Sequence, residues 1–295
     1  MNTTTISATE REIASQPSCW SRAIELAPAF ESVLPQAGET VAVVGCGTSW
    51  FIAQAYATLR ENLGLGVTDA FAASHMPAGR TYDRILAITR SGTTTEVLDL
   101  MKATSARTVV ITGDPTSPAP AIADDAIVLD FADETSVVQT RFATTALMLL
   151  RAHLGEDLAA VIADGERAII DPIDDALITA EQFTFLGQGW AYGLAREAAL
   201  KMREAAGAWT ESYLAMEYRH GPISIAAPGR VVWALGSLPV GLNGDVDRTG
   251  AHLETAGLDP VAELVRIQRL AVLIAESRGL NPDTPRNLTR SVILG

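Results

Sequence analysis

The sequence has little cysteine and little histidine, which removes the usual ingredients of disulfide frameworks and metal clusters. Its two cysteines in 295 residues, Cys19 and Cys46, do not form a Cys-x-x-Cys pair. Its four histidines lie far apart in the sequence and lack the spacing of metal ligands. We therefore expect no metal site. We also expect no cofactor, and the low cysteine content favours a reducing, cytoplasmic location.

Positive charge is scarce as well. Lysine and arginine number 22 against 35 aspartates and glutamates, which gives a formal net charge of −13. Such an excess of negative charge disfavours nucleic acid and an anionic membrane surface as partners. We also expect no leader or membrane span, because the start of the chain shows no arginine-led apolar segment. The 48% hydrophobic content is enough for the core of one large or two medium-sized domains.

Apolar runs alternate with helical patterns through the first half of the chain. Four runs have the character of buried strands: Val41–Val44, Ile85–Ile88, Thr108–Thr112 and Ile127–Phe131. Strands that alternate with helices indicate βαβ units, and hence a parallel sheet with helices on both faces. The sequence therefore predicts an α/β fold.

The second half repeats this beginning faintly. Phe185–Gly189 and the helix after it parallel Val43–Gly47 and its following helix, with one residue inserted. The similarity suggests a duplicated α/β unit, although a shared preference of βα turns for glycine would give the same pattern. After Val231–Leu235 little strand sequence follows, so we expect the second unit to be shortened. Two prolines after Asn281 predict an extended tail.

Two glycine-hinged loops rich in hydroxyl groups follow two of the predicted strands. Gly45–Ser49 and Arg90–Thr95 each lead from a strand into a helical pattern. Parallel strands bring such loops to one edge of a sheet, where hydroxyls and the N–H groups of helix N-termini suit a compact phosphate dianion. Arg90 offers a forked contact to the same phosphate. The alternative is a pair of ordinary tight turns with a surface arginine.

Glu197, Lys201 and Glu204 stand at positions i, i+4 and i+7 of a predicted helix, and therefore share one face. The alanines around them predict that this face is partly buried, and a carboxylate in such a place is suited to moving a proton near neutral pH. The alternative is a solvated helix with routine Glu/Lys pairs. Spacing alone does not decide between the two.

Two further segments carry polar groups at predicted loops. His220 precedes a Gly-Pro turn, which places its imidazole on a loop, as in many catalytic sites; a lone histidine is also often structural. Thr135–Arg141 follows a strand, so Ser136, Gln139 and Thr140 are candidates for a polar cradle around the ligand. The same segment is also consistent with a simple cap for the next helix.

In this order, the segments resemble the sugar isomerase (SIS) domain family, specifically the double-SIS isomerase half of glucosamine-6-phosphate synthase and its stand-alone relatives, the sugar-phosphate isomerases and amino-sugar-phosphate deaminases. The matching segments are Gly45–Ser49, Thr89–Thr94, Glu134–Arg141, Glu197–Glu204, His220–Pro222 and Pro285–Val292. Six ordered motifs make the resemblance specific. It implies two flavodoxin-like αβα sandwiches: a first unit at residues 1–155 with an N-terminal helix, and a second at 156–295 with a linker helix and the C-terminal tail.

The resemblance also implies the roles of individual residues. Glu204 would shuttle a proton between C1 and C2 of the sugar through an enediol or enolamine, and His220 would assist ring opening. The residues expected to hold the phosphate are Ser49, Thr89, Arg90, Ser91 and Thr94, and those expected near the rest of the substrate are Gly47, Thr48, Val137, Gln139, Glu197 and Arg290. In such enzymes the histidine can come from a second subunit, which implies a homodimer with composite sites.

Two departures from the family pattern limit the chemistry. Arg290 stands where the synthase has a lysine that can form a Schiff base, and a guanidinium remains protonated and forms no such imine. The chain also enters the SIS region within some forty residues, so we expect it to have no glutaminase domain.

Two classes of function remain in view. The first is an isomerase or deaminase that acts on a phosphorylated sugar or amino sugar by proton transfer. The second is a sugar-phosphate sensor without chemistry, although the first forty residues show no helix-turn-helix pattern. A nicotinamide-dependent enzyme is disfavoured because neither loop carries Gly-x-Gly-x-x-Gly.

Overall fold

The computed structural model describes residues 6–294. Its α-helices are α1 (Ala8–Ala14), α2 (Gln16–Leu26), α3 (Thr48–Asn62), α4 (Thr95–Ala103), α5 (Ala119–Ile122), α6 (Arg141–His153), α7 (Ala159–Ile170), α8 (Asp175–Ile178), α9 (Ala191–Ala206), α10 (Leu242–Asp247) and α11 (Pro260–Ser277). Its strands are β1 (Val41–Gly45), β2 (Thr68–Ala72), β3 (Arg84–Ile88), β4 (Arg107–Thr112), β5 (Asp125–Val128), β6 (Gln182–Gly187), β7 (Thr210–Leu214), β8 (Arg230–Leu235) and β9 (His252–Glu254). Its 3₁₀ turns are η1 (Ala27–Phe30), η2 (Ala73–His75), η3 (Asp130–Ala132), η4 (Glu217–Arg219) and η5 (Pro222–Ile225).

The chain forms two compact units, which we name by their sheets. The β1–β5 unit comprises Ser18–Glu134, Arg141–Leu158 and residues 289–294. The β6–β9 unit comprises residues 6–17, Thr135–Thr140 and Ala159–Leu288. Each unit therefore includes a short segment whose neighbours in the sequence belong to the other unit. The division predicted from the sequence places residues 1–155 in the first SIS unit and residues 156–295 in the second. It follows the order of the chain, and it stays a prediction about the domains of the family.

The sheet of the β1–β5 unit is entirely parallel, with the strand order β2-β1-β3-β4-β5. This is the flavodoxin-like order, so the fold class predicted from the sequence is confirmed. β2 lies on one side of β1, at the edge of the sheet, and β3 lies on the other side of β1. The direction in which strands are added therefore reverses after β2. Ligands of such sheets bind at the carboxyl ends of the strands on either side of this reversal, here β1 and β3. Both predicted phosphate loops start there.

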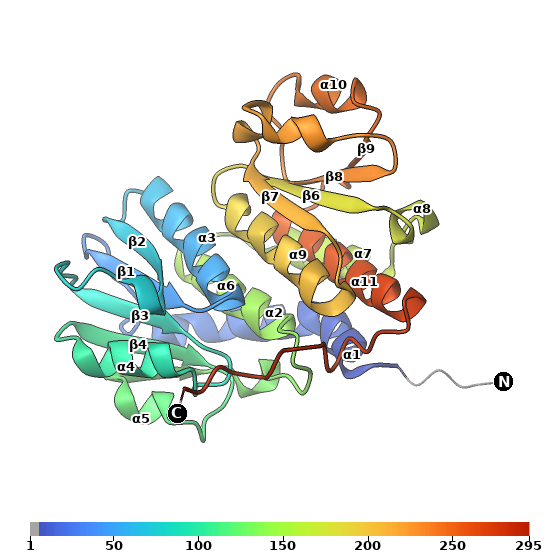
Figure 1. Ribbon diagram of the computed structural model, residues 1–295. Helices are drawn as coiled ribbons and strands as arrows, with labels where there is room; N and C mark the ends of the chain where they lie inside the picture. Colours follow the sequence, from blue (N-terminus) through green and yellow to red (C-terminus); the bar gives the residue numbers. More distant parts are fainter. Residues whose placement is uncertain (1–5, 295) are drawn as a thin grey trace. The chain divides into compact units, whose positions relative to one another are not determined.

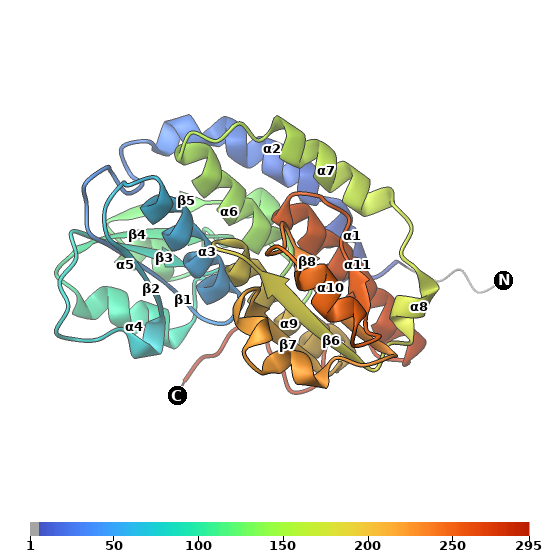
Figure 2. The same cartoon turned by 90° about the horizontal axis from the view of Figure 1, so that it is seen from above.

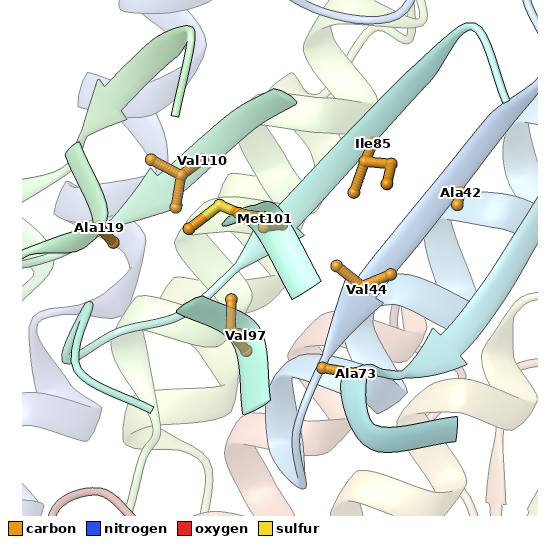
Figure 3. Packing of buried hydrophobic residues seen from close by; sticks show 9 residues of the cluster. Ala42, Val44, Ala73, Ile85, Val97, Met101, Val110 and Ala119 are labelled. Atoms are coloured by element: carbon orange, nitrogen blue, oxygen red, sulfur yellow. The ribbon is translucent and has the colours of Figure 1, made fainter. Parts of the chain in front are cut away.

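Helices cover both faces of this sheet (Figure 1). Alternate strand residues, among them Ala42, Val44 and Ile85, form a buried cluster with Val97 and Met101 of α4 on one face (Figure 3). α3 and α6 pack against each other on the opposite face. β1 and β3 are buried throughout, which explains why Val41–Val44 and Ile85–Ile88 are continuously apolar in the sequence.

The β6–β9 unit repeats this topology with one strand fewer among the described residues. Its parallel strands have the order β7-β6-β8-β9, which corresponds to the order of β2, β1, β3 and β4. α10 lies on one face of this sheet, whereas α9 and α11 lie on the other (Figure 1). α7 runs beside α11 in both views (Figure 1, Figure 2). The second unit is thus a shortened copy of the first, as the sequence predicts.

The first strand of each sheet in chain order, β1 or β6, ends in a glycine for the same steric reason. A Cβ atom on Gly45 would lie 2.7 Å from the backbone carbon of Ser49, and one on Gly187 would lie 2.3 Å from the carbonyl oxygen of Ala191. Only glycine lets the following helix begin so close to its strand. The glycines of the faint sequence repeat are therefore explained by the same need in both units, a close approach of strand and helix backbones.

Some elements differ from the sequence predictions. The strand predicted at Ile127–Phe131 ends at Val128, and Phe131 lies in η3. β2, β7 and β9 were not expected as strands, because they are short sheet elements with mixed polar and apolar residues. Within residues 6–294, no helix is both long enough and apolar enough to cross a membrane.

Candidate active site

The first loop of the candidate site joins β1 to α3. Gly47, with φ of 55°, turns the chain, and α3 begins at the next residue. Thr48 and Ser49 therefore occupy the first turn of α3, where both are buried. A first helical turn presents backbone N–H groups with a positive dipole, which suits an anion.

The second loop joins β3 to α4 and starts at the same edge of the sheet, because β1 and β3 are neighbouring parallel strands. Thr89 and Ser91 are buried, and Thr94 is the N-cap residue of α4. Ser91 Oγ accepts from the backbone N–H of Thr93 at 3.3 Å and lies 3.0 Å from Thr93 Oγ1. The loop thus holds several hydroxyls beside a helix N-terminus, which is chemistry suited to a phosphate dianion.

Arg90 has a different environment from the one its position in the loop predicts. Its guanidinium forms an ion pair with Glu134 at 3.5 Å, and the two side chains are 2% and 0% exposed. Arg90 Nη2 also donates to the carbonyl oxygen of Arg290 at 3.2 Å. The Arg90 guanidinium therefore serves the protein's own carboxylate and backbone. The predicted phosphate contact stays a prediction.

Arg290 lies on the tail and contacts the segment just before the 135–140 loop. Its Nη2 pairs with Asp133 Oδ1 at 2.5 Å, and its Nη1 donates to the carbonyl oxygen of Glu134. About a third of its side chain is exposed. The substrate contact expected of Arg290 also stays a prediction, and these bonds show what holds the side chain in the protein.

The tail then runs along the start of α4. Ser291 Oγ lies 2.9 Å from Thr93 Oγ1, and the backbone N–H of Thr95 donates to the carbonyl oxygen of Val292 at 3.3 Å. The N–H of Leu294 donates to Thr95 Oγ1 at 2.9 Å. The predicted extended tail is therefore bonded to the β3–α4 loop.

The acidic face predicted on α9 is buried. Lys201 bonds to the carboxylate of Glu204 and lies 3.5 Å from Glu197 Oε1. The exposed fractions of the Glu197, Lys201 and Glu204 side chains are 0%, 1% and 19%. The interpretation as a solvated helix with routine pairs is therefore excluded. Lys201 holds the carboxylate of Glu204 in a fixed place, and Glu204 is the member of the group with access to solvent.

His220 is exposed on the loop between η4 and η5, as its Gly-Pro context predicts. Its backbone N–H donates to the carbonyl oxygen of Glu217 at 2.9 Å, and Gly221 follows with φ of 126°. The neighbouring Arg219 pairs with Asp245 at 2.6 Å and donates to the carbonyl oxygen of Val240 at 2.8 Å. These bonds fix the chain beside His220 and leave its imidazole in solvent.

Two cavities lie beside these loops, each within one unit. One of about 450 Å³ is lined by η2, β3 and α4, including Glu96 and Ile85. Burial, and then the charge of Glu96, raise the pKa of the Cys46 thiol in the first loop. The other cavity, of about 750 Å³, is lined by the segment directly after β8, residues 236–241, among other residues. Among the described residues, no group of three or more His, Cys, Asp or Glu side chains is arranged to hold a metal.

The predicted site residues divide between the units. Seven of them, Gly47, Thr48, Ser49, Thr89, Arg90, Ser91 and Thr94, lie with Arg290 in the β1–β5 unit, and Val137, Gln139, Glu197, Glu204 and His220 lie in the β6–β9 unit. No pattern in the sequence predicted a role for Asp133, Glu12 or Asp283, which bond to the candidate loops or to the tail. A single Asp or Glu in a sequence does not indicate which distant residue its carboxylate will bind.

No protein-family model matches the chain. It is 30% identical to a glutamine–fructose-6-phosphate aminotransferase (isomerizing) of Methanothermobacter thermautotrophicus, over 86% of this chain and 51% of that protein. The chain thus spans about half the length of the curated relatives it matches.

Solved structures match over almost the whole chain. Glucosamine-6-phosphate deaminase of Thermotoga maritima has a TM-score of 0.82 and 26% identity, and the match covers 98% of this chain and 100% of that one. Tagatose-6-phosphate ketose/aldose isomerase of Escherichia coli has a TM-score of 0.78 and 18% identity, and the match covers 96% of this chain and 97% of that one. The second match shows the fold alone.

Proposed function

We infer that this chain is a member of the double-SIS family of sugar-phosphate isomerases and deaminases, which its relatives and structural neighbours support, and that it is an enzyme that acts on a phosphorylated sugar or amino sugar by proton transfer. The reaction is aldose–ketose isomerisation, or removal of the amino group of an amino-sugar 6-phosphate. The single observation that carries the proposal is the carboxylate of Glu204, fixed by the buried Lys201 and still partly exposed. The glutamine-dependent activity of the longer relatives is not part of it.

The loop residues bind the substrate in this proposal. The phosphate is held by the hydroxyls of Ser49, Thr89, Ser91 and Thr94 and by the N–H groups at the starts of α3 and α4. Phosphate binding anchors the sugar, so that its C1 and C2 atoms are held in one place during the reaction. His220 assists ring opening, which exposes the carbonyl group.

Glu204 moves the proton. As a carboxylate it removes the proton from C2 of the open-chain aldose, and the electron pair forms the C1–C2 double bond of an enediol while O1 gains a proton. The protonated Glu204 then returns the proton to C1, and O2 loses its proton as the ketose carbonyl forms. With an amino group on C2, the same step gives an enolamine and then an imine, which water hydrolyses to ketose and ammonia.

The test combines a substrate panel with one conservative variant. Purified protein is incubated in D₂O with the 6-phosphates of fructose, glucose, glucosamine, galactosamine and tagatose, and NMR follows exchange at C1 and C2. We expect Glu204→Gln to lower turnover at least about 100-fold while ligand affinity stays within a few-fold, because the variant keeps the shape and loses the base. Glu166→Gln, on the exposed face of α7, is the matched control.

The competing function is a sugar-phosphate sensor. Binding of a sugar phosphate without proton exchange by the wild-type protein would establish it and defeat the enzyme. Full activity of Glu204→Gln would instead keep the enzyme and reject Glu204 as its base.

The proposal extends to the assembly and location of the protein. We propose a homodimer in which His220 completes the site of the partner subunit, and a cytoplasmic location, which the low cysteine content supports. Light scattering gives the oligomeric state, and a mixture of Glu204→Gln and His220→Ala subunits regains activity only if sites are shared between subunits.

A further inference from the structure

The loop at Thr135–Thr140 belongs to the β6–β9 unit, although the chain on both sides of it belongs to the β1–β5 unit. It contains Val137 and Gln139, which are expected to contact the sugar. A loop separated in this way from its sequence neighbours needs partners to hold it. Those partners come from α1 and from the segment after α11.

Glu12 of α1 holds the first two residues of the loop. Its Oε1 accepts from the backbone N–H of Thr135 at 2.6 Å and from that of Ser136 at 3.3 Å, and its Oε2 accepts from the hydroxyl of Ser136. Glu12 as a whole is only 4% exposed. Hydrogen bonds from several donors to one buried carboxylate are strong and directional, so they fix the backbone of both residues.

Asp283 holds the next residue and also the start of α1. Its carbonyl oxygen accepts from the backbone N–H of Val137 at 3.0 Å. Its carboxylate accepts from the N–H groups of Ala8 and Thr9 at 2.9 and 2.8 Å and from the Thr9 hydroxyl at 2.7 Å. Asp283 therefore joins the loop to the same helix that carries Glu12.

We propose that Glu12 and Asp283 are positioning residues for the sugar. They fix the three consecutive residues 135–137 before any ligand arrives, and so set the place of Val137 and Gln139. This proposal rests on the proposed function, because it assigns the loop to the substrate. A loop ordered in advance costs a ligand less conformational entropy on binding than a loop that the ligand must order.

Substitution of Glu12 separates positioning from chemistry. Glu12→Ala removes the acceptor of three hydrogen bonds, and we expect KM for the converted sugar phosphate to rise about tenfold or more while kcat stays within about threefold. Glu12→Gln rescues KM, because its amide oxygen still accepts from both N–H groups and its amide N–H donates to the Ser136 hydroxyl. Glu10→Ala, on the exposed face of the same helix, is the matched control.

Amide hydrogen exchange in the ligand-free protein provides a readout that does not depend on activity. We expect Glu12→Ala to speed exchange at residues 135–137 about tenfold or more relative to the control variant. If Glu12→Ala does not fold, Glu12→Asp replaces it, because the shorter side chain cannot reach both Thr135 and the Ser136 hydroxyl.

The outcomes are distinguishable. Faster exchange with unchanged KM overturns the positioning role and leaves the proposed function standing. Unchanged exchange at residues 135–137 overturns it as well, whatever the kinetics. If the wild-type protein neither binds nor converts any member of the panel, the proposed function itself fails, and the positioning role for a sugar fails with it. Faster exchange together with a raised KM that Glu12→Gln restores supports the proposal.

Discussion

Arg90 is assigned to the phosphate by its place in the sequence and to Glu134 by its contacts in the protein, and the two roles predict opposite results. We expect Arg90→Met to act on stability first. The side chains of the Arg90–Glu134 pair are 2% and 0% exposed. Loss of one partner of such a pair leaves the other charge buried and costs about 3–5 kcal/mol. That cost is a large part of the 5–15 kcal/mol that holds a typical domain folded.

The expected change is measurable in two ways. Urea unfolding should show the lost 3–5 kcal/mol as a lower midpoint with an unchanged slope, and Tm should fall by roughly 10 °C. Adding Glu134→Gln to Arg90→Met should recover at least about half of the loss, because the uncompensated charge disappears while an acceptor for the Arg141 N–H remains. Arg107→Met is the control, since the Arg107–Asp125 pair is exposed and its loss should cost no more than about 1 kcal/mol.

The result that refutes this reasoning is specific. If Arg90→Met keeps its unfolding free energy within about 0.5 kcal/mol while affinity for a sugar phosphate falls tenfold or more, Arg90 faces the ligand. The ion pair would then be incidental.

Two further predictions concern titrating groups. Burial is the larger cause and the charge of Glu96 the smaller cause that raise the pKa of the Cys46 thiol. Glu96→Gln should therefore lower that pKa and speed alkylation of Cys46 by iodoacetamide near pH 8. An unchanged rate would show that Glu96 does not act on the thiol. Burial lowers the pKa of His153 below its ordinary 6.5, so the folded protein binds this proton less readily than the unfolded chain. The stability that neutral His153 contributes is therefore present above pH 6.5 and is lost as the pH falls toward the pKa of His153 in the folded protein. We expect His153→Gln to reduce the difference in unfolding free energy between pH 7.5 and pH 5.5. An equal difference in the wild-type and variant proteins would contradict this prediction.

The sequence predicts those parts of the fold that repeat over a short range. β1 and the inner parts of β3 and β4, Ile85–Ile88 and Val109–Ile111, are apolar runs because both faces of their sheet are covered, and this burial can be predicted directly from the sequence. β2 and β9 are not detectable in that way, because each is short and of mixed polarity, and each is a strand only through pairing with a neighbour.

The same limit applies to the candidate site. Helical spacing is sufficient to place Lys201 beside Glu204, because partners three or four residues apart meet on any helix. The contact of Arg290 with Glu134 spans 156 residues, and that of Glu12 with Thr135 spans 123. No local pattern encodes such pairs. The sequence therefore indicates which loops are candidates for the site, and only the structure shows what holds them.

The tail bonded to α4 has a consequence for synthesis on the ribosome. The strands β1–β5 emerge first, yet residues 289–294, which complete their unit, are made some 200 residues after Thr95. A nascent chain can build the first sheet and its Arg90–Glu134 pair early, but the start of α4 lacks its bond to Val292 until that residue has been made. Contacts of such long sequence separation form late in folding. The candidate phosphate loop therefore reaches its final bonding only after Val292 and Leu294 have been made.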